Sequence, residues 1–118
     1  MIPRVDTRAR RRNSGRAAEA RSFSGHLKWL RGRPCACAAR HAADCSGKIE
    51  AAHVDRAGGK GVSLKVADYH AVPLCAGHHA EYHRGAATFE AASGLDLVAV
   101  AERYAAASPH RAAWEHLR

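Results

Sequence analysis

The sequence is poor in bulky apolar residues and has no long apolar run. Of its 118 residues, 27 are alanine, whereas there are only two Phe, two Trp and one Met. A core built largely from alanine is small, and small domains usually need disulfides or a bound metal for stability. Because no apolar stretch is long enough for a signal peptide or a membrane span, we expect no membrane partner and a cytoplasmic location with reduced thiols.

Acidic residues are nearly missing from the start of the chain. Residues 1–33 hold ten of the 19 Lys and Arg but only Asp6 and Glu19, whereas the remainder holds nine residues of each sign. Such an arginine-rich arm on a neutral body is typical of proteins that contact a nucleic acid backbone, and a solubilising tail is the alternative. The candidate contacts are Arg8, Arg10, Arg11, Arg12 and Arg16. Residues 1–24 lack apolar periodicity and are predicted to be disordered when free, and residues 25–118 are predicted to form one domain.

Cysteine and histidine are the residues that the chain concentrates. It has four cysteines and nine histidines, and Cys75, His78, His79 and His83 fall within nine residues. A reducing compartment disfavours disulfides, so we expect a bound metal to stabilise the small core. If a helix begins just after Pro73, His79 and His83 lie four residues apart on one face, and Cys75 and His78 lie at its start.

The cysteines predict a closed structural zinc site. The preferred ligand set is Cys35, Cys45, Cys75 and His78, which would give one tetrahedral ion four protein ligands. Cys37 is separated from Cys35 by a single residue, so simultaneous binding by both is awkward. Cys37 in place of Cys35 remains open.

His79 and His83 predict a site of a different kind. Two imidazoles leave positions open for water and substrate, which is typical of a catalytic ion, here Mg²⁺ or another divalent cation. Such an ion neutralises charge on a phosphodiester, and neutral histidine is well suited to activate water near pH 7. The candidate base is His53, on a predicted strand over residues 49–54.

The order of the predicted elements indicates an α+β domain. A strand over 49–54, a glycine-rich turn, a strand over 69–74 and the metal-binding helix make a ββα unit, preceded by a zinc knuckle over 35–48. Ser24 is expected to cap a short flanking helix, Asp96 a helix to about Ala107, and Ser108 a last helix containing Trp114. The glycine-rich turn lacks the Gly-Lys-Ser/Thr ending of a phosphate-binding P-loop, and no Cys pair stands where a C₂H₂ finger needs it.

These motifs together resemble the HNH, or His-Me finger, endonucleases, and more narrowly the phage and prophage group related to the recombination-enhancement nuclease Ref. The matching stretches are Ile49-Glu50-Ala51-Ala52-His53-Val54, the glycine-rich loop, and Tyr69-His70-Ala71-Val72-Pro73-Leu74-Cys75 followed by His78, His79 and His83. The resemblance implies that His53 is the general base, that His70 orients it or braces the finger loop, and that His79 and His83 bind the catalytic ion. It also implies DNA as the partner in a bacterial or phage-infected host, and leaves open whether a recombinase takes part.

One position departs from the family pattern. Many of these nucleases have an Asp or His metal ligand immediately before the base, where this chain has Ala52. Either a nearby carboxylate such as Glu50 or Asp55, or water and phosphate, completes the site, or the site is degenerate. The sequence therefore predicts a metal-dependent DNA endonuclease, with a catalytically degenerate, zinc-stabilised nucleic-acid-binding module as the alternative.

Overall fold

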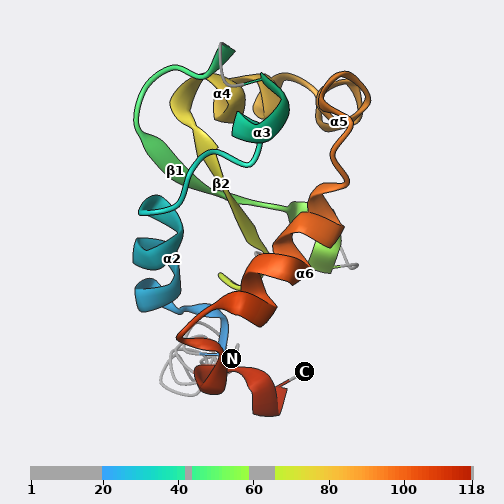
Figure 1. Ribbon diagram of the computed structural model, residues 1–118. Helices are drawn as coiled ribbons and strands as arrows, with labels where there is room; N and C mark the ends of the chain where they lie inside the picture. Colours follow the sequence, from blue (N-terminus) through green and yellow to red (C-terminus); the bar gives the residue numbers. More distant parts are fainter. Residues whose placement is uncertain (1–19, 42–43, 59–65, 118) are drawn as a thin grey trace, which may run out of the picture.

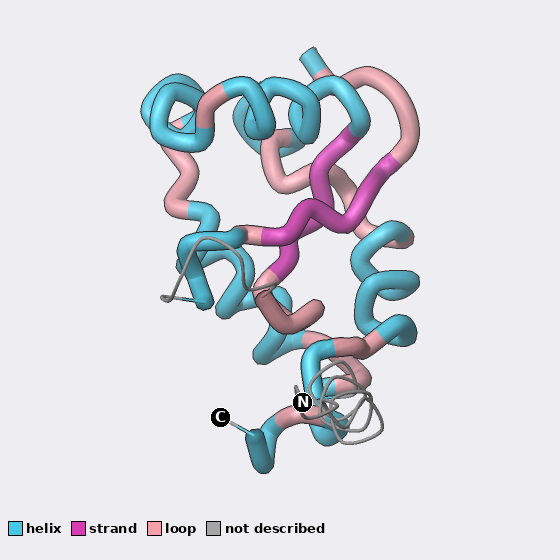
Figure 2. Tube along the Cα trace, turned by 180° about the vertical axis from the view of Figure 1, so that it is seen from behind, coloured by secondary structure: helices cyan, strands magenta, loops and turns pink. Residues whose placement is uncertain are grey.

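The computed structural model of the chain describes residues 20–41, 44–58 and 66–117. Its elements are α2 (Ser24–Arg31), α3 (Ala38–His41), β1 (Ile49–His53), η2 (Asp55–Gly58), β2 (Ala71–Cys75), α4 (Ala76–Arg84), α5 (Ala86–Ser93), α6 (Leu97–Ala107), η3 (Arg111–Ala113) and η4 (Glu115–Leu117). The two strands form the centre, with α2 on one side and α6 on the other, while α3, α4 and α5 gather at one end (Figure 1). The view from behind in Figure 2 shows the same arrangement, which confirms the predicted α+β class.

The sheet is a single antiparallel pair. Glu50 lies opposite Leu74 and Ala52 opposite Val72, so these four residues share one face. His53 lies opposite Ala71 and, by strand alternation, belongs to the other face. All five residues of β2 are buried, because helices cover the strand on both sides.

The second strand leads directly into α4, as a ββα unit requires. Cys75 ends β2 and caps the helix, because its sulfur accepts the backbone N–H of His78. The helix therefore begins at Ala76, three residues after Pro73, later than the prediction. His79 and His83 still fall within it, four residues apart.

The core is small and divides into two parts. Leu30, Val72, Leu74 and Leu97 are completely buried around the sheet. At the far end, Trp114 packs on an aromatic group whose other members are Phe23, His26 and Tyr69. In the part of the chain that the structure describes, no helix has the length and apolar composition needed to cross a membrane.

Several predicted boundaries were wrong. Ser24 is the first residue of α2 and not its cap; Phe23 takes that position without a side-chain cap, and its backbone N–H donates to Asp68. The predicted last helix is replaced by η3 and η4, since the packing of Trp114 outweighs the weak helical pattern of so short a segment. Helix α5 was not predicted. The arm up to residue 19 and the loop from 59 to 65 lie outside the described residues.

Candidate metal centre and the neighbouring histidines

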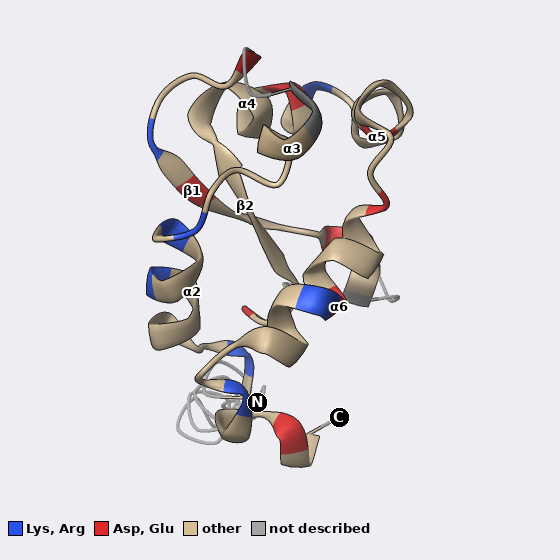
Figure 3. Ribbon diagram, viewed as in Figure 1, with Lys and Arg blue, Asp and Glu red and all other residues tan. Residues whose placement is uncertain are grey.

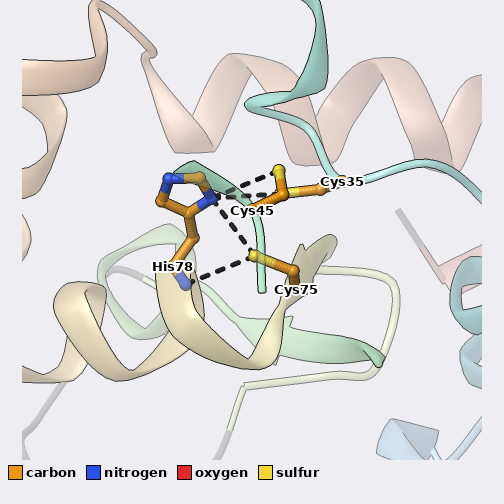
Figure 4. Close-up of side chains that lie close together, drawn as sticks. All are labelled: Cys35, Cys45, Cys75 and His78. Atoms are coloured by element: carbon orange, nitrogen blue, oxygen red, sulfur yellow. Dashed lines mark hydrogen bonds between the residues drawn. The ribbon is translucent and has the colours of Figure 1, made fainter. Parts of the chain in front are cut away.

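Three thiols and one imidazole converge between the knuckle and the start of α4 (Figure 4). The Nδ1 atom of His78 lies 3.2 Å from the sulfur of Cys75, 3.5 Å from that of Cys35 and 3.7 Å from that of Cys45. All four ligand atoms lie within 4.8 Å of one another, so this group could hold one metal ion. Three thiolates and one imidazole are a donor set that zinc prefers in closed, four-coordinate sites.

Backbone contacts bring the two halves of this centre together. The N–H of Ala36, next to Cys35, donates to the carbonyl of Pro73 in β2 at 2.8 Å. Next to Cys45, the N–H of Ser46 donates to the sulfur of Cys75 at 3.4 Å. The N–H of Gly77 in turn donates to the carbonyl of Ser46 at 3.0 Å. These bonds hold the two ligand-bearing segments, some thirty to forty residues apart in the sequence, against each other without the help of an ion.

The surroundings of Cys75 favour its thiolate form. Burial works against its ionisation, but the backbone N–H groups of His78 and Ser46 donate to its sulfur and, with the neighbouring thiols, lower its pKa below the ordinary value. Burial instead raises the pKa of Cys37 and of Cys45 to about 12. A metal cation reverses that penalty for its ligands, because a bound thiol is held deprotonated.

Cys37 lies beside the centre but outside the group that could hold the ion. Its thiol is buried in the core, 1% exposed, and next to Cys35. All four cysteines are free thiols. The geometry therefore favours the predicted set with Cys35, and leaves Cys37 as a packing residue.

A second group of side chains lies across α4 and β1. The Nε2 atoms of His79 and His83 face each other at 3.0 Å. The other ring nitrogen of His79, Nδ1, lies 2.8 Å from a carboxylate oxygen of Glu50. The carboxylate thus fixes the tautomer of His79, with the proton on Nδ1 and the lone pair of Nε2 directed toward His83.

Of the two carboxylates considered because of Ala52, Glu50 is the one that contacts the histidine pair. Ala52 is fully buried opposite Val72 and offers no ligand. Glu50 stands two residues earlier on the same face of β1 and reaches α4. Asp55, the other carboxylate considered, is exposed in η2.

His53 makes its contact on the other face of the strand. Its Nε2 atom lies 2.9 Å from a carboxylate oxygen of Asp68, and the imidazole is 37% exposed. Asp68 was not predicted as a site residue, since it is 15 positions away and no local motif marks it.

His70 immediately precedes β2 and lies close to Glu102 of α6. Its carbonyl accepts the N–H of Val54, the residue after His53, at 2.8 Å. Its imidazole is mostly buried, with Nδ1 3.9 Å from a carboxylate oxygen of Glu102. Of the two roles considered for His70, these contacts favour bracing of the loop.

A hollow of about 610 Å³ lies on the opposite side of α4 from His79 and His83. Its lining includes Asp44, Glu81, Arg84 and Phe89, with His78 at one wall. Charges of both signs face it, and they define no particular ligand. The five arginines predicted to contact nucleic acid lie outside the described residues.

Fold and site together define a small α+β domain with a cysteine and histidine cluster that could bind a metal. Residues 17–108 match the family described as protein of unknown function, DUF968, and the chain belongs to this family. No curated protein and no solved structure matches the chain.

Proposed function

We propose that this chain is a metal-dependent endonuclease of the HNH, or His-Me finger, type that hydrolyses DNA phosphodiester bonds, with a structural zinc at the cysteine cluster. One observation carries the proposal. The Nε2 atoms of His79 and His83 lie 3.0 Å apart, and Glu50 holds the opposite nitrogen of His79 at 2.8 Å. A histidine pair backed by a carboxylate is a recurrent arrangement of metal sites.

The distances fit binding of one cation by both rings. Two nitrogens 3.0 Å apart can each lie at about 2.1 Å from a common ion, the usual length of a bond from imidazole to a divalent metal. Nitrogen ligands suit transition metals better than Mg²⁺, which prefers oxygen, so we expect the site to favour a transition ion. The ion would neutralise the phosphate and stabilise the leaving oxygen.

His53 is suited to act as the general base. Asp68 accepts from Nε2, so the proton sits on that nitrogen and Nδ1 has a lone pair to receive the proton of a water molecule. At 37% exposure the ring is open to substrate. Glu50, which holds His79, and His53 lie on opposite faces of β1.

Basic side chains support a polyanionic substrate. Helix α2 has Lys28 and Arg31 in its last turn and no acidic residue. Figure 3 shows these blue turns of α2 on the same flank as the basic segment that leads into β1, where Lys48 is exposed. Together with the arm, they would attract a DNA backbone without reading its sequence.

A nicking assay tests the proposal directly. Purified protein, loaded with zinc, is incubated with supercoiled plasmid and Mn²⁺, Mg²⁺ or no added ion. We expect nicking that His53→Ala reduces by about 100-fold or more, the usual contribution of a general base, and that His83→Ala also reduces strongly because it removes a ligand of the ion. His116→Ala, an exposed histidine in η4, is the matched control and should keep full activity. Equal nicking by all four proteins, or none by the unaltered chain, would contradict the proposal.

The buried Ala52 favours one competing function, a non-catalytic zinc module that binds nucleic acid. Counting metals separates the two. The module would hold one tight zinc that depends on Cys75. The nuclease would also hold an exchangeable ion, detected with Mn²⁺ or Co²⁺, which His83→Ala abolishes while the tight zinc remains.

A further inference from the structure

Asp68 is bonded to three groups that belong to two different parts of the chain. One carboxylate oxygen, Oδ1, lies 2.9 Å from Nε2 of His53. The other, Oδ2, accepts the backbone N–H of Phe23 at 2.8 Å. The backbone N–H of Asp68 donates to the carbonyl of Arg21, also at 2.8 Å. This one residue therefore holds both the candidate base and the segment through which the arginine-rich arm joins the body.

The bonding pattern determines the tautomer of His53. An ionised carboxylate only accepts hydrogen bonds, so Nε2 of His53 must be the donor and carry the proton. The Asp68 side chain is 17% exposed, so its charge-assisted hydrogen bonds to His53 and Phe23 are largely shielded from solvent. Asp68 thereby keeps the lone pair on Nδ1, the nitrogen that would receive the proton from water.

The segment at Phe23 is anchored at the same place. The ring of Phe23 packs against Tyr69 and Trp114, with centroid distances of 5.7 and 5.3 Å.

We propose that Asp68 is a positioning residue that joins the segment at Arg21 and Phe23 to the candidate base His53. It sets the His53 tautomer and ties His53 to the segment at Arg21 and Phe23. This inference rests on the proposed nuclease function for its purpose, but the geometry it asserts can be measured without any activity.

Asp68→Asn is the discriminating variant. The backbone N–H of Phe23 is a fixed donor, so the amide oxygen of Asn must turn toward it. The amide NH₂ then faces His53 and requires Nε2 to accept, which moves the ring proton to Nδ1. This variant should retain the fold and the arm contact and change only the tautomer.

The test combines nitrogen NMR of the His53 ring, amide exchange at Phe23 and plasmid nicking. We expect the unaltered protein to be protonated at Nε2 and Asp68→Asn at Nδ1, with Phe23 exchange unchanged and nicking reduced by about 100-fold or more. Asp68→Ala should accelerate Phe23 exchange at least tenfold. Glu115→Gln, an exposed carboxylate in η4, should match the unaltered protein throughout.

Two results would overturn the inference. One is an Nε2 proton on His53 in both the unaltered protein and Asp68→Asn, and the other is unchanged Phe23 exchange in Asp68→Ala. A chain that nicks no DNA would instead remove the proposed function, while the tautomer and exchange measurements still decide whether Asp68 holds both groups.

Discussion

Two buried thiols, Cys37 and Cys75, lie close to the same centre but differ in what they contact. Cys75 faces His78 and receives two backbone N–H groups, whereas Cys37 packs in the core without joining the ligand group. The chemical environment, more than burial, separates a ligand from a packing residue here.

Cys75→Ala should therefore remove the tight zinc, and Cys37→Ala should not. Binding to a structural zinc site contributes on the order of 10 kcal/mol at neutral pH, so we expect Cys75→Ala to lose most of the cooperative thermal transition. Cys37→Ala removes only a small buried side chain and should cost about 1 kcal/mol. Metal analysis and thermal unfolding of both variants test this. Stoichiometric zinc in Cys75→Ala, or its loss in Cys37→Ala, would reassign the ligands.

His26 gives the molecule a stability that depends on pH. It is fully buried, its Nδ1 lies 2.9 Å from the hydroxyl of Ser108, and its Nε2 has no hydrogen-bond partner in the described parts of the chain. Burial lowers the pKa of His26 to about 4, an effect that His110 strengthens and Asp68 opposes. The unfolded chain therefore binds a proton here at a higher pH than the folded one.

The free energy of unfolding should fall as pH decreases from about 6.5 to about 4, because only the unfolded state gains the His26 proton in that window. The full contribution, about 3 kcal/mol, is present above pH 6.5 and is lost near pH 4. His26→Gln should flatten this slope, and His116→Gln should not. Urea unfolding of the zinc-loaded proteins at several pH values gives the comparison. Parallel curves for the unaltered protein and His26→Gln would refute it.

At the scale of elements, the knuckle and the start of α4 are fitted together through two glycines. Gly47 has a φ of +80°, and a Cβ there would lie 2.7 Å from the Cβ of Ala76. The atom nearest to a Cβ at Gly77 would be the hydroxyl of Ser46, an exposed side chain that can rotate away.

The two glycines should therefore respond differently to alanine. Gly47→Ala meets both an unfavourable backbone conformation, at about 1–2 kcal/mol, and a contact with Ala76 that cannot move aside, so we expect weaker zinc binding. Gly77→Ala should be neutral or slightly stabilising, because alanine favours a helix over glycine by up to about 1 kcal/mol. A competition titration with a zinc chelator measures both. Equal zinc affinity in the two variants would show that the knuckle adapts.

The sequence predicted the features that depend on local spacing. The four-residue separation of His79 and His83 predicted that both lie on one helix, which is α4. Asp96 caps α6, which ends at Ala107 as predicted. The cysteine and histidine cluster was predicted across distant segments because its residues share metal-ligand chemistry, but contacts without such a pattern were not predictable. Asp68 reaches His53 and Phe23 through tertiary structure alone.

At the scale of the whole molecule, the contacts of Asp68 define where the arm can be removed. A deletion of residues 1–19 spares Arg21 and Phe23 and takes away six arginines. If all six contact phosphates, the slope of log affinity against log salt should become shallower by up to about 5. Binding to a fluorescent duplex between 50 and 300 mM salt measures this, with thermal unfolding to verify the body. An unchanged slope would assign the arm another role.

The cysteine cluster also has a topological consequence. Cys35 and Cys45 precede β1, whereas Cys75 and His78 follow the loop that joins the two strands. A chain cut anywhere between Gly58 and Val66 would therefore leave two ligands on each fragment and one strand of the sheet on each. A metal bound at the cluster would hold the two fragments together. A chain cleaved by a protease in this loop should therefore stay associated until a chelator removes the metal.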